Sequence, residues 1–115
     1  MTFVKINEIL FPASIVGKIS DKDWDNRESK AITLEMTYEE AMATFVDGLE
    51  WAIVYQADSY TDKDGSLITP EAETYDNSDY SVAGPVTDNR DGTVTVKMGV
   101  ITDGEALAEL MEVLA

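Results

Sequence analysis

The sequence predicts one α+β domain, in which an antiparallel or mixed sheet of about six or seven strands carries two helices on one face. Two helix-start motifs, each followed by apolar residues at helical spacing, indicate helices at about 38–47 and about 103–114. Several stretches in which apolar and polar residues alternate indicate strands with one buried face. With 115 residues, of which 44% are apolar, the chain is long enough to bury one core.

The N-terminal residues predict a hairpin. Its strands are residues 2–6 and 9–19, and Pro12 restricts the second strand to a sheet edge or a bulge. The turn between them is Asn7-Glu8, where Asn-Gly would be the natural pair for a tight turn. The sequence therefore leaves the tightness of this first turn open.

The first helix lies between two predicted strands. Thr37 and Glu40 have the spacing of a capping box, and Gly48 suits the left-handed residue that ends a helix. The apolar residues in between form one predicted stripe: Tyr38, Ala41, Met42, Phe45 and Val46. The strands on either side have buried faces formed by Ile32, Leu34 and Met36, and by Trp51, Ile53 and Tyr55.

The second half begins with an acidic insert at about 57–79, which has neither helical nor strand periodicity and is predicted to be irregular. A hairpin follows between Tyr80 and Met98, with Gly92 in its turn. Thr102 and Glu105 form a second capping box, and the helix after it has an apolar face at i, i+3, i+4 and i+7: Leu107, Leu110, Met111 and Leu114.

Composition excludes several classes of function. Lys and Arg number 8 against 23 Asp and Glu, and the net charge of −15 repels nucleic acid and anionic lipid. The chain has no Cys and no His, which removes disulfides, thiolate metal sites, cysteine nucleophiles and the usual general base. We therefore expect a protein that is not an enzyme, has no catalytic residues, and binds neither nucleic acid nor membrane.

Calcium is the one metal that the residue inventory favours, because it needs only oxygen ligands. Asp62, Asp64 and Glu71 have the spacing of positions 3, 5 and 12 of an EF-hand loop. Position 1 is Tyr60, however, and Pro70 lies inside the loop. The alternative interpretation is an exposed loop rich in turn-forming residues and without a cofactor.

A second candidate is the charged turn around Trp24, with Asp21, Asp23 and Asp25. Trp24 could be an exposed anchor for a protein partner, since Trp is enriched at interface hot spots. The interpretation that we favour is that the turn folds back and Trp24 caps the core, its indole N–H meeting a carbonyl or carboxylate. The three carboxylates then belong to a solvated turn.

Three segments also carry a resemblance: residues 21–36 (DKDWDNRESKAITLEM), 37–54 (TYEEAMATFVDGLEWAIV) and 74–99 (TYDNSDYSVAGPVTDNRDGTVTVKMG). They resemble an uncharacterised family of small acidic proteins encoded in phages and prophages of gut Firmicutes, near tail and baseplate genes. The resemblance covers nearly the whole chain except the acidic insert. It implies a tail-associated structural or assembly protein, present in the host cytoplasm during synthesis and then in the virion.

The expected partners are phage tail proteins or further copies of the chain. Two alternatives stay open. A regular array of carboxylates can imitate DNA phosphates, so the chain could be an acidic host-directed inhibitor that acts as a DNA mimic. It could also be a calcium-stabilised binding module built on the loop around Asp62.

Overall fold

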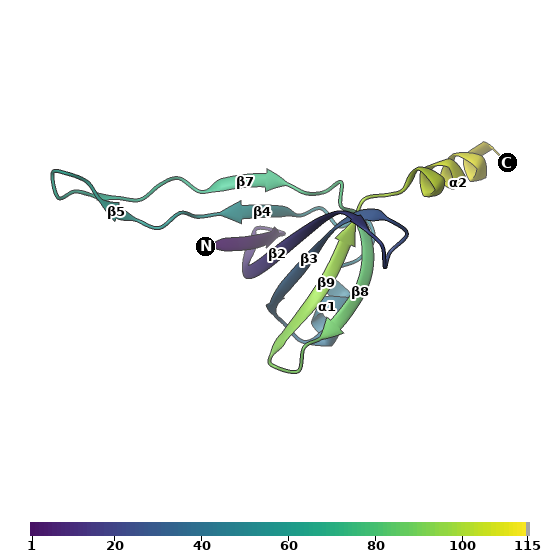
Figure 1. Cartoon of the computed structure of the whole chain (residues 1–115), viewed down its shortest axis with the longest axis horizontal. Helices are drawn as coiled ribbons and strands as arrows, with labels where there is room; N and C mark the ends of the chain where they lie inside the picture. Colours follow the sequence, from purple (N-terminus) through teal and green to yellow (C-terminus); the bar gives the residue numbers. More distant parts are fainter. Residues whose placement is uncertain (115) are drawn as a thin grey trace.

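The computed structural model describes residues 1–114 and has an α+β fold that is mostly sheet, as the sequence predicts. Seven strands form one antiparallel sheet in the order β7-β4-β1-β2-β3-β9-β8, and β5 and β6 form a separate two-stranded ribbon (Figure 1). The elements are β1 (Thr2–Ile6), β2 (Ile9–Asp21), β3 (Arg27–Glu35), α1 (Tyr38–Thr44), β4 (Ala52–Tyr55), β5 (Tyr60–Thr61), β6 (Leu67–Ile68), β7 (Glu73–Asp76), β8 (Val82–Asp88), β9 (Thr93–Gly99) and α2 (Asp103–Leu114).

The longest strand, β2, belongs to both halves of the sheet. Residues 9–12 pair with β1, and residues 13–18 pair with β3. Pro12 therefore lies at the change of partner, where β2 has only one paired neighbour. A residue that cannot donate a backbone hydrogen bond is tolerated at such a position. The sequence predicts a sheet edge or a bulge at Pro12. The structure has a continuous strand that changes its pairing partner there.

The first turn is tight despite its glutamate. Asn7 and Glu8 both have positive φ, at 50° and 67°, and they connect the paired residues Ile6 and Ile9. These angles are those of a two-residue hairpin turn whose twist matches the flanking strands. Asn tolerates the left-handed region well, whereas Glu occupies it at a cost.

The core lies between one face of the sheet and α1, which packs on β8 and β9. Thr37 accepts a hydrogen bond from the Glu40 amide at 3.1 Å, which confirms Thr37 as the helix cap. The other half of the predicted capping box, from the Thr37 amide to the Glu40 carboxylate, is not among the hydrogen bonds of the described residues. The helix ends at Thr44 instead of near residue 47. Its predicted single stripe is divided, because Ala41 and Phe45 are buried in the core while three apolar side chains are exposed: Tyr38, Met42 and Val46.

The insert at 57–79 is irregular only in part, because β5, β6 and β7 lie within it and belong to a long hairpin, while the segments between these strands have no regular structure. Strand β4 pairs with β7, and the ribbon continues to the paired strands β5 and β6 at its far end. Figure 1 shows this hairpin, hereafter the arm (residues 52–76), projecting from the rest of the sheet. The molecule measures 67 × 33 × 27 Å, and its radius of gyration of 17.3 Å exceeds the value of about 13 Å typical of a compact chain of this length.

At the base of the arm, the strand predicted to bury Trp51, Ile53 and Tyr55 does not keep this alternation. Trp51 is in the core, as expected, but Tyr55 is 47% exposed and the intervening Val54 is buried. Val54 is paired with Phe3 on β1 and with Thr74 on β7, so it has a neighbouring strand on each side. Tyr55 lies where the arm leaves the core, and its side chain remains exposed there.

Helix α2 begins where predicted but does not cover the sheet. It projects away from the sheet, on the side opposite the arm (Figure 1). In the part of the chain that the structure describes, α2 packs against no other helix or strand. Leu107, Leu110 and Met111 are consequently more than half exposed. The predicted face residue Leu114 has a side chain outside the described set.

Candidate interaction site

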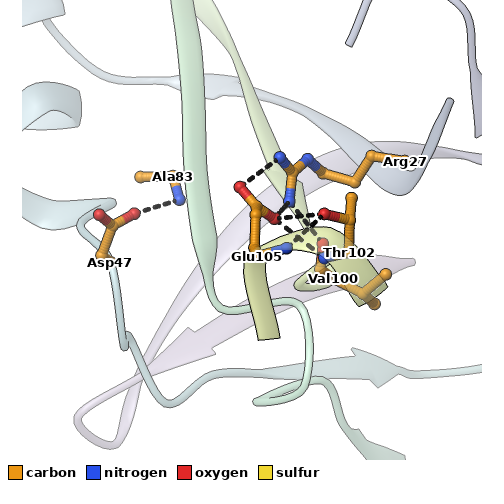
Figure 2. A network of polar contacts seen from close by, with 6 residues as sticks. All are labelled: Arg27, Asp47, Ala83, Val100, Thr102 and Glu105. Carbon is orange, nitrogen blue, oxygen red and sulfur yellow. Dashed lines mark hydrogen bonds and ion pairs between the residues drawn. The ribbon is translucent and has the colours of Figure 1, made fainter. Parts of the chain in front are cut away.

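A buried arginine attaches α2 to the sheet. Arg27, at the start of β3, is only 3% exposed. Its Nη1 donates to Glu105 Oε1 at 2.5 Å and to the Val100 carbonyl at 2.7 Å, and its Nη2 donates to Glu105 Oε2 at 2.9 Å. Figure 2 shows the guanidinium facing the carboxylate, a two-point geometry that fixes orientation as well as distance. Arg27 and Glu105 together are called the clamp below.

The capping box of α2 is part of the same network. Glu105 Oε1 accepts hydrogen bonds from the Thr102 amide at 2.9 Å and from the Thr102 hydroxyl at 3.1 Å, as the sequence predicts (Figure 2). The hydrogen bonds from Arg27, followed by that from the Thr102 amide, lower the pKa of Glu105 to about 2. The carboxylate is therefore ionised at neutral pH, and it joins the first turn of the helix to the sheet.

Trp24 packs against its own chain. The Arg27 guanidinium carbon lies 4.6 Å from the centre of the Trp24 ring, a cation–π geometry. The ring also lies directly on two glycines, since a Cβ on Gly84 or on Gly99 would come within 2.7 Å or 2.9 Å of it. The hydrogen bonds found among the described residues include none from the indole N–H, so packing and the cation–π contact, instead of the expected hydrogen bond, hold the ring.

The three carboxylates of the Trp24 turn differ in their surroundings. Asp21 is 1% exposed and accepts hydrogen bonds from Lys97 Nζ at 2.8 Å and Ser29 Oγ at 3.2 Å. The hydrogen bond from Lys97 lowers the pKa of Asp21. Asp21 is therefore a buried structural group and not part of a solvated turn, whereas Asp23 and Asp25 are exposed.

The calcium candidates lie on the arm. Asp62 Oδ1 accepts hydrogen bonds from the amides of Asp64 and Ser66, at 2.9 Å and 3.0 Å, and so holds the turn between β5 and β6. Gly65 provides the positive φ, at 79°, that this turn needs. In the part of the chain that the structure describes, no three carboxylates gather as metal ligands, so Asp62, Asp64 and Glu71 are not brought together.

An open groove of about 780 Å³ lies beside the point where β2 changes its pairing partner, lined in part by Phe11, Pro12 and Leu34. Among the lining side chains of the described residues, Glu35 is the one with an acidic or basic group. This groove therefore brings no pair of ionisable side chains together for acid–base chemistry.

Exposed apolar side chains gather on both projections. On α2 they are Leu107, Leu110 and Met111, and on the arm they are Tyr55, Tyr60, Leu67 and Tyr75. The outer side of α1 adds a third group, and Asp47 anchors the end of this region by accepting a hydrogen bond from the Ala83 amide at 2.8 Å (Figure 2). Groups of exposed apolar side chains are typical of surfaces that contact other proteins.

Among the described residues, no helix combines the length and hydropathy needed to cross a bilayer. Comparisons with family models, with curated proteins and with solved structures find no match to this chain. The clamp was not anticipated from the sequence, because Arg27 and Glu105 are 78 positions apart and no local pattern connects them.

Proposed function

We propose that this chain is a non-enzymatic structural or assembly protein of a phage or prophage, associated with the tail, that acts through protein–protein contacts. The observation that carries the proposal is the division of the molecule into a packed sheet and two projections that bury little surface within the chain. Both projections expose apolar side chains to solvent.

The two projections are the kinds of element that gain stability from neighbours. An isolated two-stranded hairpin is marginally stable in water, and so is a single helix of about 12 residues. The far part of the arm is such a hairpin, and α2 has 12 residues. Contacts with other subunits would bury their apolar side chains and provide that stability.

The phage setting is supported by the resemblance of residues 21–36, 37–54 and 74–99 to proteins encoded near tail and baseplate genes. These segments include the Trp24 turn, the clamp residue Arg27, α1 and the hairpin of β8 and β9. The resemblance leaves out the outer part of the arm, from Ala57 to about Glu73, and this is the part in which contacts with a particular partner would vary.

The experiment shortens the arm and follows incorporation into particles. Residues 58–70 are replaced by an Asn-Gly turn, which retains the pairing of β4 with β7. We expect the thermal midpoint to change by a few degrees at most and the shortened chain to be lost from purified tails. A control chain with Ile9→Asp, exposed at the start of β2 and outside these apolar groups, should still be incorporated.

Absence of the wild-type chain from particles, together with failure to recover any tail protein bound to it, would contradict the proposal. Normal incorporation of the shortened chain would assign the contacts to other surfaces and remove the arm from the proposal.

A further inference from the structure

Within the part of the chain that the structure describes, no helix or strand covers the apolar face of α2. Leu107, Leu110 and Met111 are 57%, 54% and 62% exposed, although they are placed at the spacing of a buried helical face. The clamp fixes the first turn, so the direction of the helix away from the sheet is set by specific contacts. A helix held in this way presents its apolar face to solvent.

The second half of β2 is an open sheet edge. Beyond Pro12, β2 pairs with β3 on one side and, within the described residues, with no strand on the other. Ile19, in the irregular stretch between Lys18 and Asp21, is the most exposed large apolar side chain of the described residues at 90%, and Val16, paired with Ala31 on the sheet face away from the core, is 62% exposed. Long open edges are places where proteins associate. Residues 16–22 are called the β2 patch below.

The charges of the two surfaces are complementary. Every charged residue in the sequence of α2 is acidic. The β2 patch contains Lys18 and Lys22, which form no ion pair within the described residues. Lys5, Arg27 and Lys97 are already paired with carboxylates. Asp21, the one acidic residue among 16–22, is buried and bonded to Lys97, so the exposed charged side chains of the β2 patch are the two lysines, which complement an acidic helix.

Both surfaces lie at the same end of the sheet. Asp21, at the end of β2, pairs with Arg27, and Arg27 binds Glu105 in the first turn of α2. Figure 1 shows the connection from β2 to β3 and α2 extending on the same side of the molecule. A two-fold axis near this end would place each α2 against the β2 patch of the other copy, so that every contact is made twice.

We propose that a second copy of this chain covers α2, with the apolar face of each helix on the β2 patch of its partner in a two-fold dimer. The five apolar side chains on each copy would bury about 500 Å² at roughly 100 Å² apiece. With their backbone and charged neighbours, they approach the roughly 800 Å² per partner of a standard interface. The proposed dimer is one of the protein–protein contacts of the proposed function, and the dimer proposal rests on that function.

The test is sedimentation velocity of the full chain over a wide range of concentration. We expect a monomer–dimer equilibrium that Leu110→Asp and Ile19→Asp each weaken about ten-fold or more. The matched control is Met42→Asp, a similarly exposed apolar residue on α1, which should leave the equilibrium unchanged. Circular dichroism checks that each variant is folded.

A charge exchange tests the pairing itself. The double substitution Lys18→Glu with Lys22→Glu should weaken the dimer, and adding Glu109→Lys should restore part of the lost affinity. A wild-type chain that stays monomeric at all concentrations, forms larger assemblies, or dimerises without sensitivity to the α2 and β2 variants would overturn the two-fold dimer. A monomer that is nevertheless recovered bound to a tail protein overturns the dimer alone and leaves the proposed function standing.

Discussion

The two helices begin with the same motif and end in different surroundings. Each starts with Thr-x-x-Glu, in which the threonine hydroxyl caps the helix, and each continues with apolar residues at helical spacing. Helix α1 buries Ala41 and Phe45 against the sheet, whereas α2 leaves its apolar residues exposed. The shared motif thus determines where a helix begins, and it says nothing about what the helix packs against.

The difference lies in how each helix is attached. Packing of apolar side chains holds α1, and a hydrogen bond between Asp47 and the Ala83 amide adds to it. A single charged contact, the clamp, holds α2 at its first turn. Packing contributes to the global stability of the fold, whereas the clamp mainly sets the direction of a projecting element.

The largest expected effect is the loss of stability when a buried side chain next to α1 is truncated, compared with the same kind of truncation on α2. Phe45→Ala should lower the free energy of unfolding by about 3–5 kcal/mol, because it empties a buried site. Leu110→Ala, on the exposed face of α2, should change it by about 0.5 kcal/mol or less. Urea denaturation of both variants at low protein concentration measures the difference. Equal losses would show that α2 packs in the core.

The next comparison uses the same substitution at two glycines. A Cβ on Gly99 would lie 2.3 Å from Arg27 Cδ and 2.9 Å from the Trp24 ring, so Gly99→Ala should cost about 1–3 kcal/mol. Gly104, in the first turn of α2, has no such neighbour. Gly104→Ala should favour the helix locally by about 0.5–1 kcal/mol, visible as higher helicity by circular dichroism. Tolerance of Gly99→Ala would contradict the packing of Trp24 on the sheet.

Acid should weaken the clamp. The folded protein lowers the pKa of Glu105 from 4.5 to about 2, so the stabilisation is fully present above about pH 4.5 and is lost as the pH falls through 2. The carboxyl carbon shift of Glu105, followed by NMR, should therefore titrate near pH 2. In an Arg27→Gln variant the titration should return toward 4.5. Titration near 4.5 in the wild-type protein would show that the clamp is absent in solution.

The smallest expected effect concerns the first hairpin. Glu8 has a φ of 67°, a conformation that costs a residue other than glycine roughly 1 kcal/mol. Glu8→Gly should raise the free energy of unfolding by about that amount. Glu8→Ala is the control, because it removes the exposed ion pair with Lys5 but keeps the strained angle, and it should bring no gain. Equal stability of the two variants would contradict the assigned strain.

The fold class was predictable because a buried face imposes a pattern on the sequence. The strands around Ile32 and Val94 alternate for this reason, and both helix starts follow from Thr37 and Thr102. The outer part of the arm, beyond Tyr55, was missed because solvent reaches both of its faces, so no alternation is required in β5, β6 and β7. Tyr60, Leu67 and Tyr75 are all more than half exposed.

The candidate site was less predictable than the fold. The spacing of Leu107, Leu110 and Met111 predicts an apolar helical face, but it does not say what that face packs against. Asp21 looked like part of a solvated turn because its partners, Ser29 and Lys97, are distant in sequence. Contacts between segments that are far apart in the chain leave no local signal.

Hydrogen exchange of the α2 amides at two protein concentrations tests the account most directly. At low concentration we expect rapid exchange along α2 beyond the clamped first turn, while β3 and β9 stay protected, because a helix of 12 residues without packing is marginally stable. At high concentration the same α2 amides should become protected. Protection of α2 that is equal to that of β9 and independent of concentration would contradict the account, because the helix would then be stabilised within its own chain.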